Sequence, residues 1–559
     1  MSMSWRTSAP TRLTGLASIL RSSRLSKILR PAALALVLLL PFTATSVLPL
    51  LDYPNHLARM AIETADGRDP ALAAMYSLHW AFFPNLAMDL VVPALARVLP
   101  LSWAASLFAA SAVLLSVSGC IALHRAWFGG RSWWPYASAL TGFGFVLTNG
   151  FLNYLFGLGV ALWSAAIWIR LSGRAFALRA GFAIACGLVC LLCHIFAFAL
   201  LGLLLASLEL VPRRGSVRPR PGGAVLVLAA VALPFLVYKL LGPANTYSSA
   251  GQGRLFLQQL LAHGLLAEPR MRLLWLVGTV SSPAAPLSPF SLALLCGVPA
   301  AALLRRSLGA ARPILAAAVC LLIGYLLLPS TVVDNGMVYP RLALPFVLLV
   351  VAGLNPQLGP VGAPTSGAVL ALLLLGHAAG TVRIWRHQEP LLRDIRHVIA
   401  PIPPCARVLA VRDGGQAWMV DADEPPVDRV FYNGIVYANL PAILTVDRHA
   451  FWPMVFAESG KQPLVVRAPF RSMQQDDGYL PLSRQLTLEP SENRRVPGSN
   501  RWPAQLSDWR HRYDYVLVLH RRPGTTRPLE LRLVRAHGFA ALYRVTSAAK
   551  QPSCEIAKK

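Results

Sequence analysis

Long apolar runs separated by short, arginine-rich segments fill the first two thirds of the chain. Several runs approach the roughly 20 residues that an α-helix needs to cross a bilayer, and a spanning backbone must satisfy its own hydrogen bonds. The run 180–211 is too long for one crossing, so we interpret it as two short helices that meet near His194. The pattern predicts an all-α polytopic membrane domain of about 11 transmembrane helices. The apolar runs are 31–51, 101–123, 133–149, 151–169, 180–211, 224–242, 287–304, 313–329, 342–354 and 366–382.

The basic residues predict the orientation of these helices. The first 30 residues contain Arg and Lys side chains but no acid. Because basic segments stay on the cytoplasmic side, we expect 1–30 to be a cytoplasmic amino terminus and Asp52 to emerge on the outer side. A cleaved signal peptide fits less well, because the apolar run is long and no clear small-residue cleavage site precedes Asp52. The later arginine clusters, which this threading also places inside, lie at 125–131, 170–179, 213–220 and 305–312.

Two outer loops interrupt the apolar pattern. The first outer loop, 52–100, contains the short segment 85–99, "NLAMDLVVPALARVL", which carries Asp89 and Arg97 and which we take as an interfacial or re-entrant helix. If it crossed the membrane, the sides of all later loops would be reversed, and the arginine clusters argue against that. The second outer loop, 243–285, is rich in Pro, Gly and Ser and has a candidate interfacial helix near 254–266.

The composition changes near residue 384. Only three acidic residues lie between residues 90 and 384, whereas 17 of the 25 in the chain follow residue 385. We therefore expect a transmembrane domain over 31–384 and an outer soluble domain over 385–559, a normal size for one domain. Strands expected at 406–411, 463–468, 513–520 and 541–546, with helical pieces at 390–400 and 527–537, predict a small α/β fold.

The overall composition supports a membrane protein. The chain of 559 residues is 55% hydrophobic and only 14% charged, against roughly 25% charged in soluble proteins. The net charge of +27 comes mostly from loops beside apolar runs, so we expect no nucleic-acid partner. Cys186, Cys190 and Cys193 lie on one helix face, where cysteine mostly behaves as a small hydrophobe. Cys405 and Cys554 could form a disulfide outside the cell membrane or remain free thiols.

The stretch "LLDYPNHLAR" at 50–59 places ionisable groups directly after the first apolar run. Pro54 suits the first turn of a new helix, so the membrane helix is expected to end at Leu51 or Asp52. The following residues form an amphipathic pattern that fits the membrane surface. Asp52 can act as a general base toward a hydroxyl, with His56 orienting it, holding a phosphate or binding a metal. The alternative is that Asp52 only caps the helix.

Other polar residues are expected on the same outer side. His194 lies at the tip of the helical hairpin, and "TNGFLNYLFG" and "VVDNGMVYPRLALP" lie at outer turns. The Arg341 guanidinium suits phosphate, although it could simply anchor a helix at the interface. His194 could equally be a packing residue, and the two asparagines could bond across helices. With Asp52 as the catalytic candidate, the substrate-binding candidates are His56, Asn149, Asn153, His194, Asp334, Tyr339 and Arg341.

Asp52, Pro54 and His56 resemble the Asp-x-Pro-x-His type of first-loop motif in the GT-C superfamily of integral-membrane glycosyltransferases. The "YPRLALP" stretch around Arg341 is similar to the arginine-containing start of a late span in that group. The resemblance implies a GT-C-like fold, a polyprenyl-phosphate-linked sugar as donor and a lipid, protein or polysaccharide acceptor. It also implies that Asp52 activates the acceptor while Arg341, with His56, holds the carrier phosphate. Many members carry a second acid where this chain has Tyr53, so a divalent metal is left open and no cofactor is assigned.

The high Ala, Arg and Leu content is typical of a GC-rich bacterium, which would place the chain in the bacterial inner membrane with 385–559 in the periplasm. Two other functions compete with glycosyl transfer. A transporter or flippase of lipid-linked saccharide needs a polar path through the membrane, and few charges lie at membrane depth away from the outer side. The other is a non-catalytic GT-C relative that acts in envelope assembly.

Overall fold

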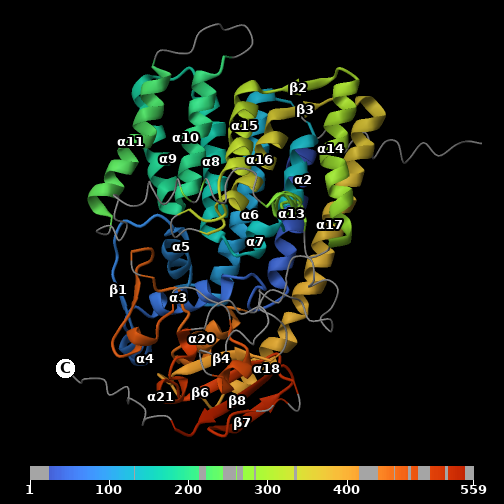
Figure 1. Cartoon of the computed structure of the whole chain (residues 1–559). Helices are drawn as coiled ribbons and strands as arrows, with labels where there is room; N and C mark the ends of the chain where they lie inside the picture. Colours follow the sequence, from blue (N-terminus) through green and yellow to red (C-terminus); the bar gives the residue numbers. More distant parts are fainter. Residues whose placement is uncertain are drawn as a thin grey trace, which may run out of the picture.

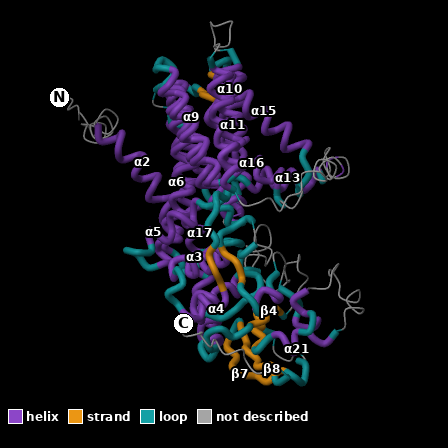
Figure 2. Tube along the Cα trace, turned by 90° about the vertical axis from the view of Figure 1, so that its left-hand side faces the viewer, coloured by secondary structure: helices purple, strands orange, loops and turns teal. Residues whose placement is uncertain are grey.

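In the computed structural model of the protein, a large helical part is joined to a small sheet at one end (Figure 1). Figure 2 shows the same division in a view turned by 90°. The structure describes residues 24–130, 132–212, 222–242, 258, 260, 268–281, 285–332, 336–413, 438–458, 460–475, 480–488, 504–522, 525 and 527–547.

The helical part is that of an integral membrane protein. Among the described residues, 5 helical segments are long and apolar enough to cross a membrane, and shorter apolar helices accompany them. Each apolar run except 133–149 contains such a helix, and His194 separates two of them as predicted. The helices are α2 (Arg24–Leu39), α6 (Leu101–Phe128), α8 (Leu152–Arg170), α9 (Phe176–Cys193), α10 (Ile195–Leu210), α11 (Gly223–Leu241), α14 (Ser288–Leu304), α15 (Arg312–Leu327), α16 (Val338–Gly353) and α17 (Gly359–Arg386).

The first membrane helix is shorter than predicted. Helix α2 ends at Leu39, a 3-10 turn (η1, Leu40–Thr43) follows, and residues 44–51 are not helical. Pro41 explains the break, because proline inside an α-helix removes a hydrogen bond and clashes with the preceding turn. The expectation of a helix to Leu51 or Asp52 is therefore wrong, and a non-helical segment leads to Asp52 instead.

The apolar run 133–149 is not a regular helix. It contains the 3-10 helix η2 (Trp134–Thr141) and one short α-helical turn, α7 (Phe145–Thr148). A Cβ on Gly144 would lie 2.3 Å from the carbonyl oxygen of Thr279, so two backbones meet closely at this point. The prediction of a helical span here is therefore wrong. The close contact of Gly144 with a distant segment, and the glycines in this run, favour an irregular backbone over a continuous helix.

Small residues allow α6 and α8 to pack closely. A Cβ on Gly159 would lie 2.5 Å from the Leu115 backbone, and one on Gly119 would lie 3.0 Å from the Gly159 carbonyl oxygen. Close backbone approach at small residues is the usual way in which membrane helices associate. Helices α6 and α8 are therefore a closely packed pair within the helical part.

The first outer loop lies between the membrane helices and the sheet (Figure 1). It contains α3 (Tyr53–Ala65), α4 (Pro70–Met75), β1 (Tyr76–Leu78) and α5 (Ala87–Leu95). Helix α5 has only 9 residues, about 14 Å of helix against roughly 30 Å of bilayer core. It does not span by length, which agrees with the interfacial or re-entrant interpretation of 85–99. The segment 254–266 lies outside the described residues except 258 and 260, and α13 (Pro269–Gly278) follows it.

The carboxyl-terminal part forms a mixed sheet of four strands. The strands are β4 (Val408–Arg412), β6 (Tyr515–Leu519), β7 (Leu531–His537) and β8 (Ala540–Val545), in the order β4-β6-β8-β7. Strands β4 and β6 are parallel, and the remaining pairs are antiparallel. Helix α18 (Gln388–Ile399) contacts β7 and β8, and the short helices α20 (Ile443–Arg448) and α21 (Trp509–Arg512) lie nearby.

Two secondary-structure expectations for this part need correction. The segment 527–537 contains strand β7 instead of a helix, because it forms a hairpin with β8 through a turn at Gly538, whose φ is +43°. The strand expected at 463–468 exists as β5 (Leu464–Val466), but it pairs with β1 in the first outer loop, Tyr76 opposite Val466. The carboxyl-terminal part is therefore connected to the first outer loop by backbone pairing.

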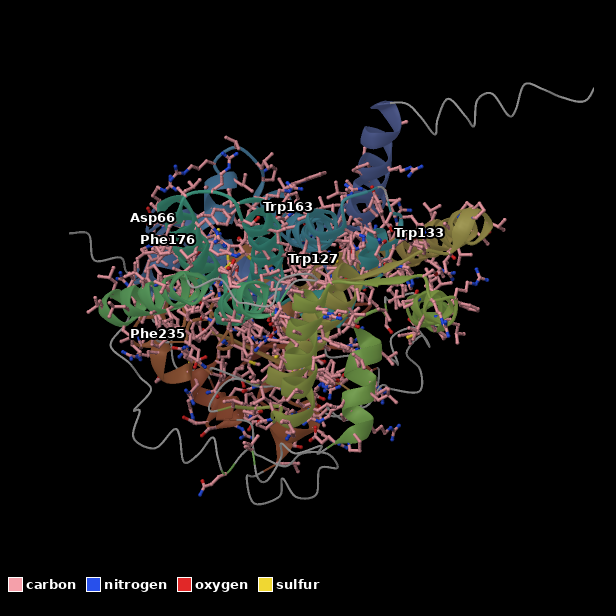
Figure 3. All side chains as sticks on the ribbon, turned by 90° about the horizontal axis from the view of Figure 1, so that it is seen from above. Asp66, Trp127, Trp133, Trp163, Phe176 and Phe235 are labelled. Atoms are coloured by element: carbon pink, nitrogen blue, oxygen red, sulfur yellow. The ribbon has the colours of Figure 1, made fainter. Side chains whose placement is uncertain are left out.

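The arginine-rich helix ends lie at the end of the bundle away from the sheet. The two-stranded pair β2 (Leu308–Ala310) and β3 (Leu354–Pro356) marks this end in Figure 1. Trp127 and Trp133, close to the carboxyl end of α6, lie at the same end, which Figure 3 views from above. Tryptophan is enriched at membrane–water interfaces, so this end suits such an interface.

Candidate functional site

The turn after α7 holds the backbone of Asp52. The Leu51 and Asp52 amides donate to the carbonyls of Thr148 and Asn149, at 2.8 and 3.3 Å. Gly150 occupies the left-handed region with φ +79°, and a Cβ there would lie 2.9 Å from the Asp52 nitrogen. Only glycine combines this backbone angle with so close an approach. Asp52 is also the N-cap residue of α3, but its side chain makes no capping hydrogen bond.

A residue of the carboxyl-terminal part of the chain, Asn439, contacts the carboxylate of Asp52. The Asn439 side-chain amide donates to the Leu51 carbonyl at 3.0 Å and lies 3.4 Å from Asp52 Oδ1. Asn439 is buried. The half-buried Asp52 therefore lies where the membrane helices, the first outer loop and the carboxyl-terminal part meet.

Arg341 lies in the first turn of α16, between aromatic rings. Its guanidinium carbon is 4.2 Å from the Phe151 ring centroid and 5.7 Å from that of Phe196. Its Nη1 donates to the Gly336 carbonyl at 3.0 Å, and its buried Nε has no partner among the described residues. A guanidinium held in this way keeps N–H groups that can donate to an anion.

Tyr154 and Asp52 link the arginine to the turn. The Tyr154 hydroxyl donates to the Arg341 carbonyl at 2.7 Å, which fixes the start of α16 against α8. The Asp52 backbone is bonded to Asn149, and the Arg341 guanidinium lies over the ring of Phe151, two residues further along the chain. Asp52 and Arg341 therefore both contact the segment 149–151, although 289 positions separate them in the chain.

His194 joins the same site from the break between α9 and α10. Its backbone is extended, with φ −173° and ψ 139°, and its Nδ1 accepts a hydrogen bond from the Phe196 amide at 3.1 Å. This bond leaves Nε2 to carry the proton of the neutral ring. The imidazole lies 5.3 Å from the Tyr154 ring and 5.6 Å from the Phe196 ring, which also lies near the Arg341 guanidinium.

The structure therefore brings together four of the candidates, Asp52, Asn149, His194 and Arg341. Asp52 and Arg341 contact the segment 149–151, and His194 and Arg341 pack near Phe196, at the end of the helices that faces the sheet. Asn149 contributes its backbone carbonyl to Asp52, and its side-chain amide donates to the Phe145 carbonyl at 2.8 Å. Chemically, the arrangement can accept a proton at one point and hold an anion at another.

His56 is buried beside the turn at Gly150. Burial, with the nearby Arg59 charge, lowers the pKa of His56 to about 3, although a hydrogen bond with the Gly150 carbonyl opposes the shift. Its ring packs edge-on against Phe456 at 5.5 Å. A neutral imidazole bonded to Gly150 supports the turn beneath Asp52. We therefore assign His56 a positioning role.

Asn153 connects two elements through its side chain. Its Oδ1 accepts from the Met88 amide, and its Nδ2 donates to the Asn85 carbonyl, both at 2.7 Å. The side chain is buried. Of the two roles left open for Asn153, bonding between segments describes these contacts, since both ends of the amide are occupied.

Tyr339 belongs to a separate cluster, and Asp334 lies outside the described residues. The Tyr339 hydroxyl donates to Glu268 Oε2 at 3.3 Å, and the Arg272 guanidinium lies 4.1 Å from its ring. Arg272 in turn donates to the Leu328 carbonyl at 2.9 Å. These contacts hold α13 against α15 and α16, so Tyr339 supports the wall of the bundle.

The described residues offer no group of three or more His, Cys, Asp or Glu placed to hold a metal ion. Asp89, a second carboxylate of the first outer loop, is paired with Arg59. Cys186, Cys190 and Cys193 are free thiols. Cys405 is disulfide-bonded, while Cys554 lies outside the described residues. Because disulfides persist in oxidising compartments, this bond agrees with a location outside the cytoplasm.

Three contributors to the site were not anticipated from the sequence. Gly150 was quoted only as part of an outer turn, and its positive φ could not be read from that stretch. Phe196 follows His194 by two positions, but its contact with Arg341 depends on how α10 and α16 pack. Asn439, in "YANLPA", carries no signal, because it reaches Leu51 and Asp52 only through the tertiary fold.

No protein-family model matches the chain, and no curated protein matches its sequence. Crystal structures of ArnT from Cupriavidus metallidurans, bound to undecaprenyl phosphate and in the apo state, are similar to the chain with TM-scores of 0.48 and 0.47. Identities are 14% and 15%, over 95% of this chain and 100% of theirs. The arabinofuranosyltransferase AftD from Mycobacteria shares 15% identity at a TM-score of 0.42, over 93% of this chain and 42% of that chain. The role of each residue rests on the contacts above.

Proposed function

We propose that the protein is a membrane glycosyltransferase that moves a sugar from a polyprenyl-phosphate carrier to an acceptor outside the cytoplasm. The observation that supports this proposal is that Asp52 and Arg341 both contact the segment 149–151, while His194 and Arg341 both pack near Phe196. A base and an anion-binding cation at membrane height are the two groups that such a transfer requires.

In the proposed reaction, Asp52 accepts the proton of the acceptor hydroxyl. The oxygen then attacks the anomeric carbon of the donor sugar, and the bond from that carbon to the phosphate oxygen breaks. Both electrons of that bond leave with the carrier as polyprenyl phosphate. Attack from the side opposite the leaving phosphate inverts the anomeric configuration. The reaction balances without a further reactant, and the carboxylic acid of Asp52 returns its proton to solvent.

Arg341 holds the leaving phosphate in this proposal. Its aromatic neighbours, Phe151 and Phe196, fix the plane of the guanidinium, and charge-assisted hydrogen bonds strengthen as the phosphate gains charge. His194 can add its Nε2 proton as a second donor. Asn439 and the turn at Gly150 position Asp52 and do not act on substrate.

A lipid-linked donor suits the position of the site. The outer compartment supplies no nucleotide sugar, whereas a membrane-bound carrier presents its sugar at the height of Asp52. In the proposed arrangement, the chain lies in a bacterial inner membrane with residues 1–30 in the cytoplasm and 31–384 as the transmembrane domain. Residues 385–559 then form a periplasmic domain that covers the site.

The proposal is tested by incubating purified protein in lipid vesicles with radiolabelled polyprenyl-phosphate sugars and a membrane extract as acceptor. We expect Asp52→Asn to lower the transfer rate by about 10²–10⁴-fold, the usual contribution of a general base. Arg341→Gln should raise the KM for the carrier by roughly tenfold or more. Asp66→Asn, in the exposed turn after α3, and Arg383→Gln, exposed at the outer end of α17, are matched controls that should remain active.

Two outcomes would overturn the assignment. Full transfer activity of Asp52→Asn would remove Asp52 as the base. Movement of a lipid-linked saccharide between the leaflets of the vesicle, without transfer to any acceptor, would replace the enzyme with a transporter. Binding of the carrier without either activity would favour a non-catalytic role in envelope assembly.

A further inference from the structure

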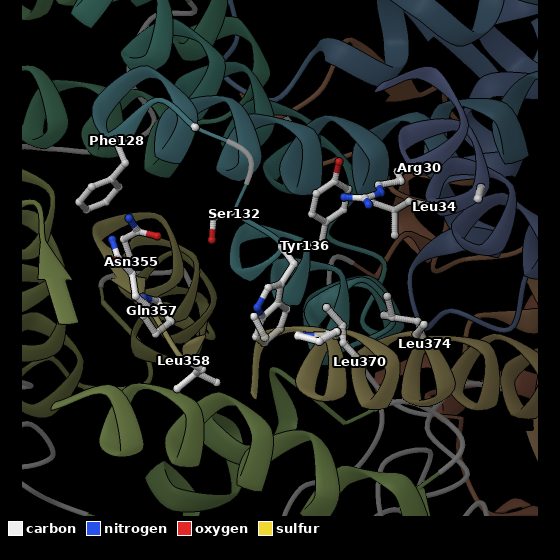
Figure 4. Close-up of a pocket in the computed structure, with 18 of the residues that line it drawn as sticks. Arg30, Leu34, Phe128, Ser132, Tyr136, Asn355, Gln357, Leu358, Leu370 and Leu374 are labelled. Atoms are coloured by element: carbon white, nitrogen blue, oxygen red, sulfur yellow. The ribbon is translucent and has the colours of Figure 1, made fainter. Parts of the chain in front are cut away.

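A cavity of about 1060 Å³ lies at the end of the bundle opposite Asp52. It lies between α2, the turn after α6, the β3–α17 connection and the first half of α17. Figure 4 shows Arg30 and Leu34 on one side, and Asn355, Gln357 and Leu358 on another. The cavity is larger than the roughly 300–1,000 Å³ of small-molecule pockets, and the proposed glycosyl transfer does not use it.

The polar part of this cavity favours an anion. Arg30 is exposed, and none of the described lining residues is acidic. The side-chain amides of Asn355 and Gln357 add possible donors. The amino terminus of α17, at Leu358 and Gly359, also lines the cavity, and it has no side-chain cap. The partial positive charge of a helix amino terminus attracts anions, so two independent features favour a negative ligand.

The remaining walls are apolar and face the lipid. Leu34 and Val37 of α2 and Leu370 and Leu374 of α17 line the inner part. The neighbouring Leu372 on α17 is 70% exposed, as expected for a side chain in contact with acyl chains. The walls thus suit acyl chains that enter from the bilayer between α2 and α17.

A second cavity flanks α2 on its other side. It measures about 440 Å³, lies between α2, α6 and α8, and shares Leu34 and Tyr136 with the first. Arg125 and Arg170 lie among its lining residues, and Arg125 donates to the Tyr136 hydroxyl at 2.8 Å. Two apolar grooves with basic residues at the same end are suited to a lipid that has acyl chains and an anionic headgroup.

We propose that the larger cavity is a binding site for an anionic phospholipid of the cytoplasmic leaflet. The phosphate lies by Arg30 and the amino terminus of α17, and the acyl chains lie along Leu34 and Leu374. Basic pockets between membrane helices on the cytoplasmic side are a known means of binding anionic headgroups. A water-soluble phosphate lacks the apolar part and is expected to bind far more weakly.

The test compares phospholipids on the purified full chain in neutral detergent. We expect dioleoyl-phosphatidylglycerol to raise the melting temperature, and dioleoyl-phosphatidylcholine and glycerol phosphate to have little effect. Arg30→Gln should weaken the phosphatidylglycerol effect by roughly fivefold in half-maximal concentration. Gly367→Leu should fill the cavity, because a Cβ at Gly367 meets only the Trp133 ring, at 3.9 Å.

Matched variants separate binding from general damage. Arg174→Gln is the control for Arg30→Gln, because Arg174 is exposed at the same end of the bundle but does not line the cavity. Gly297→Leu lies on α14, where a Cβ has nothing within 4 Å. Both should respond to phosphatidylglycerol like the parent chain, and mass spectrometry of co-purified lipid should show less anionic lipid only in Arg30→Gln and Gly367→Leu. Equal responses to both phospholipids, or equal retention by Gly367→Leu and Gly297→Leu, would overturn the proposal.

Discussion

Arg59 and Asp89 form a forked ion pair that has no solvent exposure. The Arg59 Nε lies 2.9 Å from Asp89 Oδ1, and its Nη2 donates to Asp89 Oδ2 at 3.0 Å. The pair joins α3 to α5 within the first outer loop. Glu63 lies 3.7 Å from Arg59 Nε, and burial together with the Asp89 charge holds the pKa of Glu63 well above its usual value. With Glu63 protonated and neutral, the negative charge of Asp89 balances the positive charge of Arg59 in this buried cluster.

Removing Arg59 should therefore destabilise the protein strongly. Arg59→Leu leaves Asp89 buried without a partner, and losing one member of a buried pair costs about 3–5 kcal/mol. We expect a lower melting temperature in detergent for this variant. The double variant Arg59→Leu with Asp89→Leu should recover much of the loss, because no charge remains to be buried. A single variant as stable as the parent would contradict the inferred coupling of α3 and α5.

Gly150 controls the position of Asp52. We expect Gly150→Ala to lower glycosyl transfer on the order of 100-fold, since its Cβ would displace the Asp52 backbone and a shift of about 1 Å can cost that much. Gly67→Ala is a matched control, because Gly67 has a similar φ of +74° with nothing within 4 Å of the added Cβ. Both carry the same backbone strain, so comparing transfer rates at equal melting temperature isolates the contact with Asp52.

Asn153 gives a separate test of how the first outer loop is attached. Asn153→Ala leaves the Met88 amide and the Asn85 carbonyl without their 2.7 Å partners, and unsatisfied buried groups cost about 1–3 kcal/mol each. Its melting temperature should fall, while the KM for the carrier in refolded, active protein should stay close to that of the parent. A large rise in KM at unchanged stability would instead favour the substrate-binding role.

Most helices were predictable from sequence because the bilayer imposes a simple rule on apolar length. That rule fails where proline or a distant contact decides the backbone. Pro41 ends α2 early, and the contact of Gly144 with Thr279 accompanies irregular structure in 133–149. Strand β5 was predicted, but its partner β1 lies nearly 400 positions away. A local sequence pattern predicts whether a segment is a helix or a strand, but it does not predict which distant segment it pairs with.

The candidate site was also predictable only in part: the sequence indicates which residues take part and does not show which side chains are buried. Asp52, His194 and Arg341 are expected on one side of the membrane; in the structure Asp52 and Arg341 contact the segment 149–151, and His194 and Arg341 pack near Phe196. The burial of Arg59 was not expected, because an amphipathic pattern shows charged residues on a polar face without showing that α5 covers it. The same pattern does not show that His56 is buried. In the structure, Phe456 and the turn at Gly150 enclose its side chain.

His56 should make stability depend on pH. The unfolded chain binds a proton at His56 below about pH 6.5, whereas the folded chain does so only near its lowered pKa of about 3. The stabilisation is therefore complete above pH 6.5 and is lost as pH falls toward 3, by at most about 1.4 kcal/mol per pH unit. Between pH 7.5 and 5.5, the parent chain should lose more stability than His56→Asn. Parallel profiles for the parent and His56→Asn would argue against a buried neutral imidazole.

The side of the membrane on which the sheet lies can be measured directly. Leu529 is fully exposed in the turn before β7, and Gly173 lies in the turn between α8 and α9 with nothing within 4 Å of an added Cβ. Arginine-rich turns stay in the cytoplasm, so a membrane-impermeant maleimide should label Leu529→Cys in intact spheroplasts. It should label Gly173→Cys only after permeabilisation, with the parent chain as background for the native thiols. Labelling of Gly173→Cys alone in intact cells would reverse the orientation, and with it the reason for expecting a lipid-linked donor at Asp52.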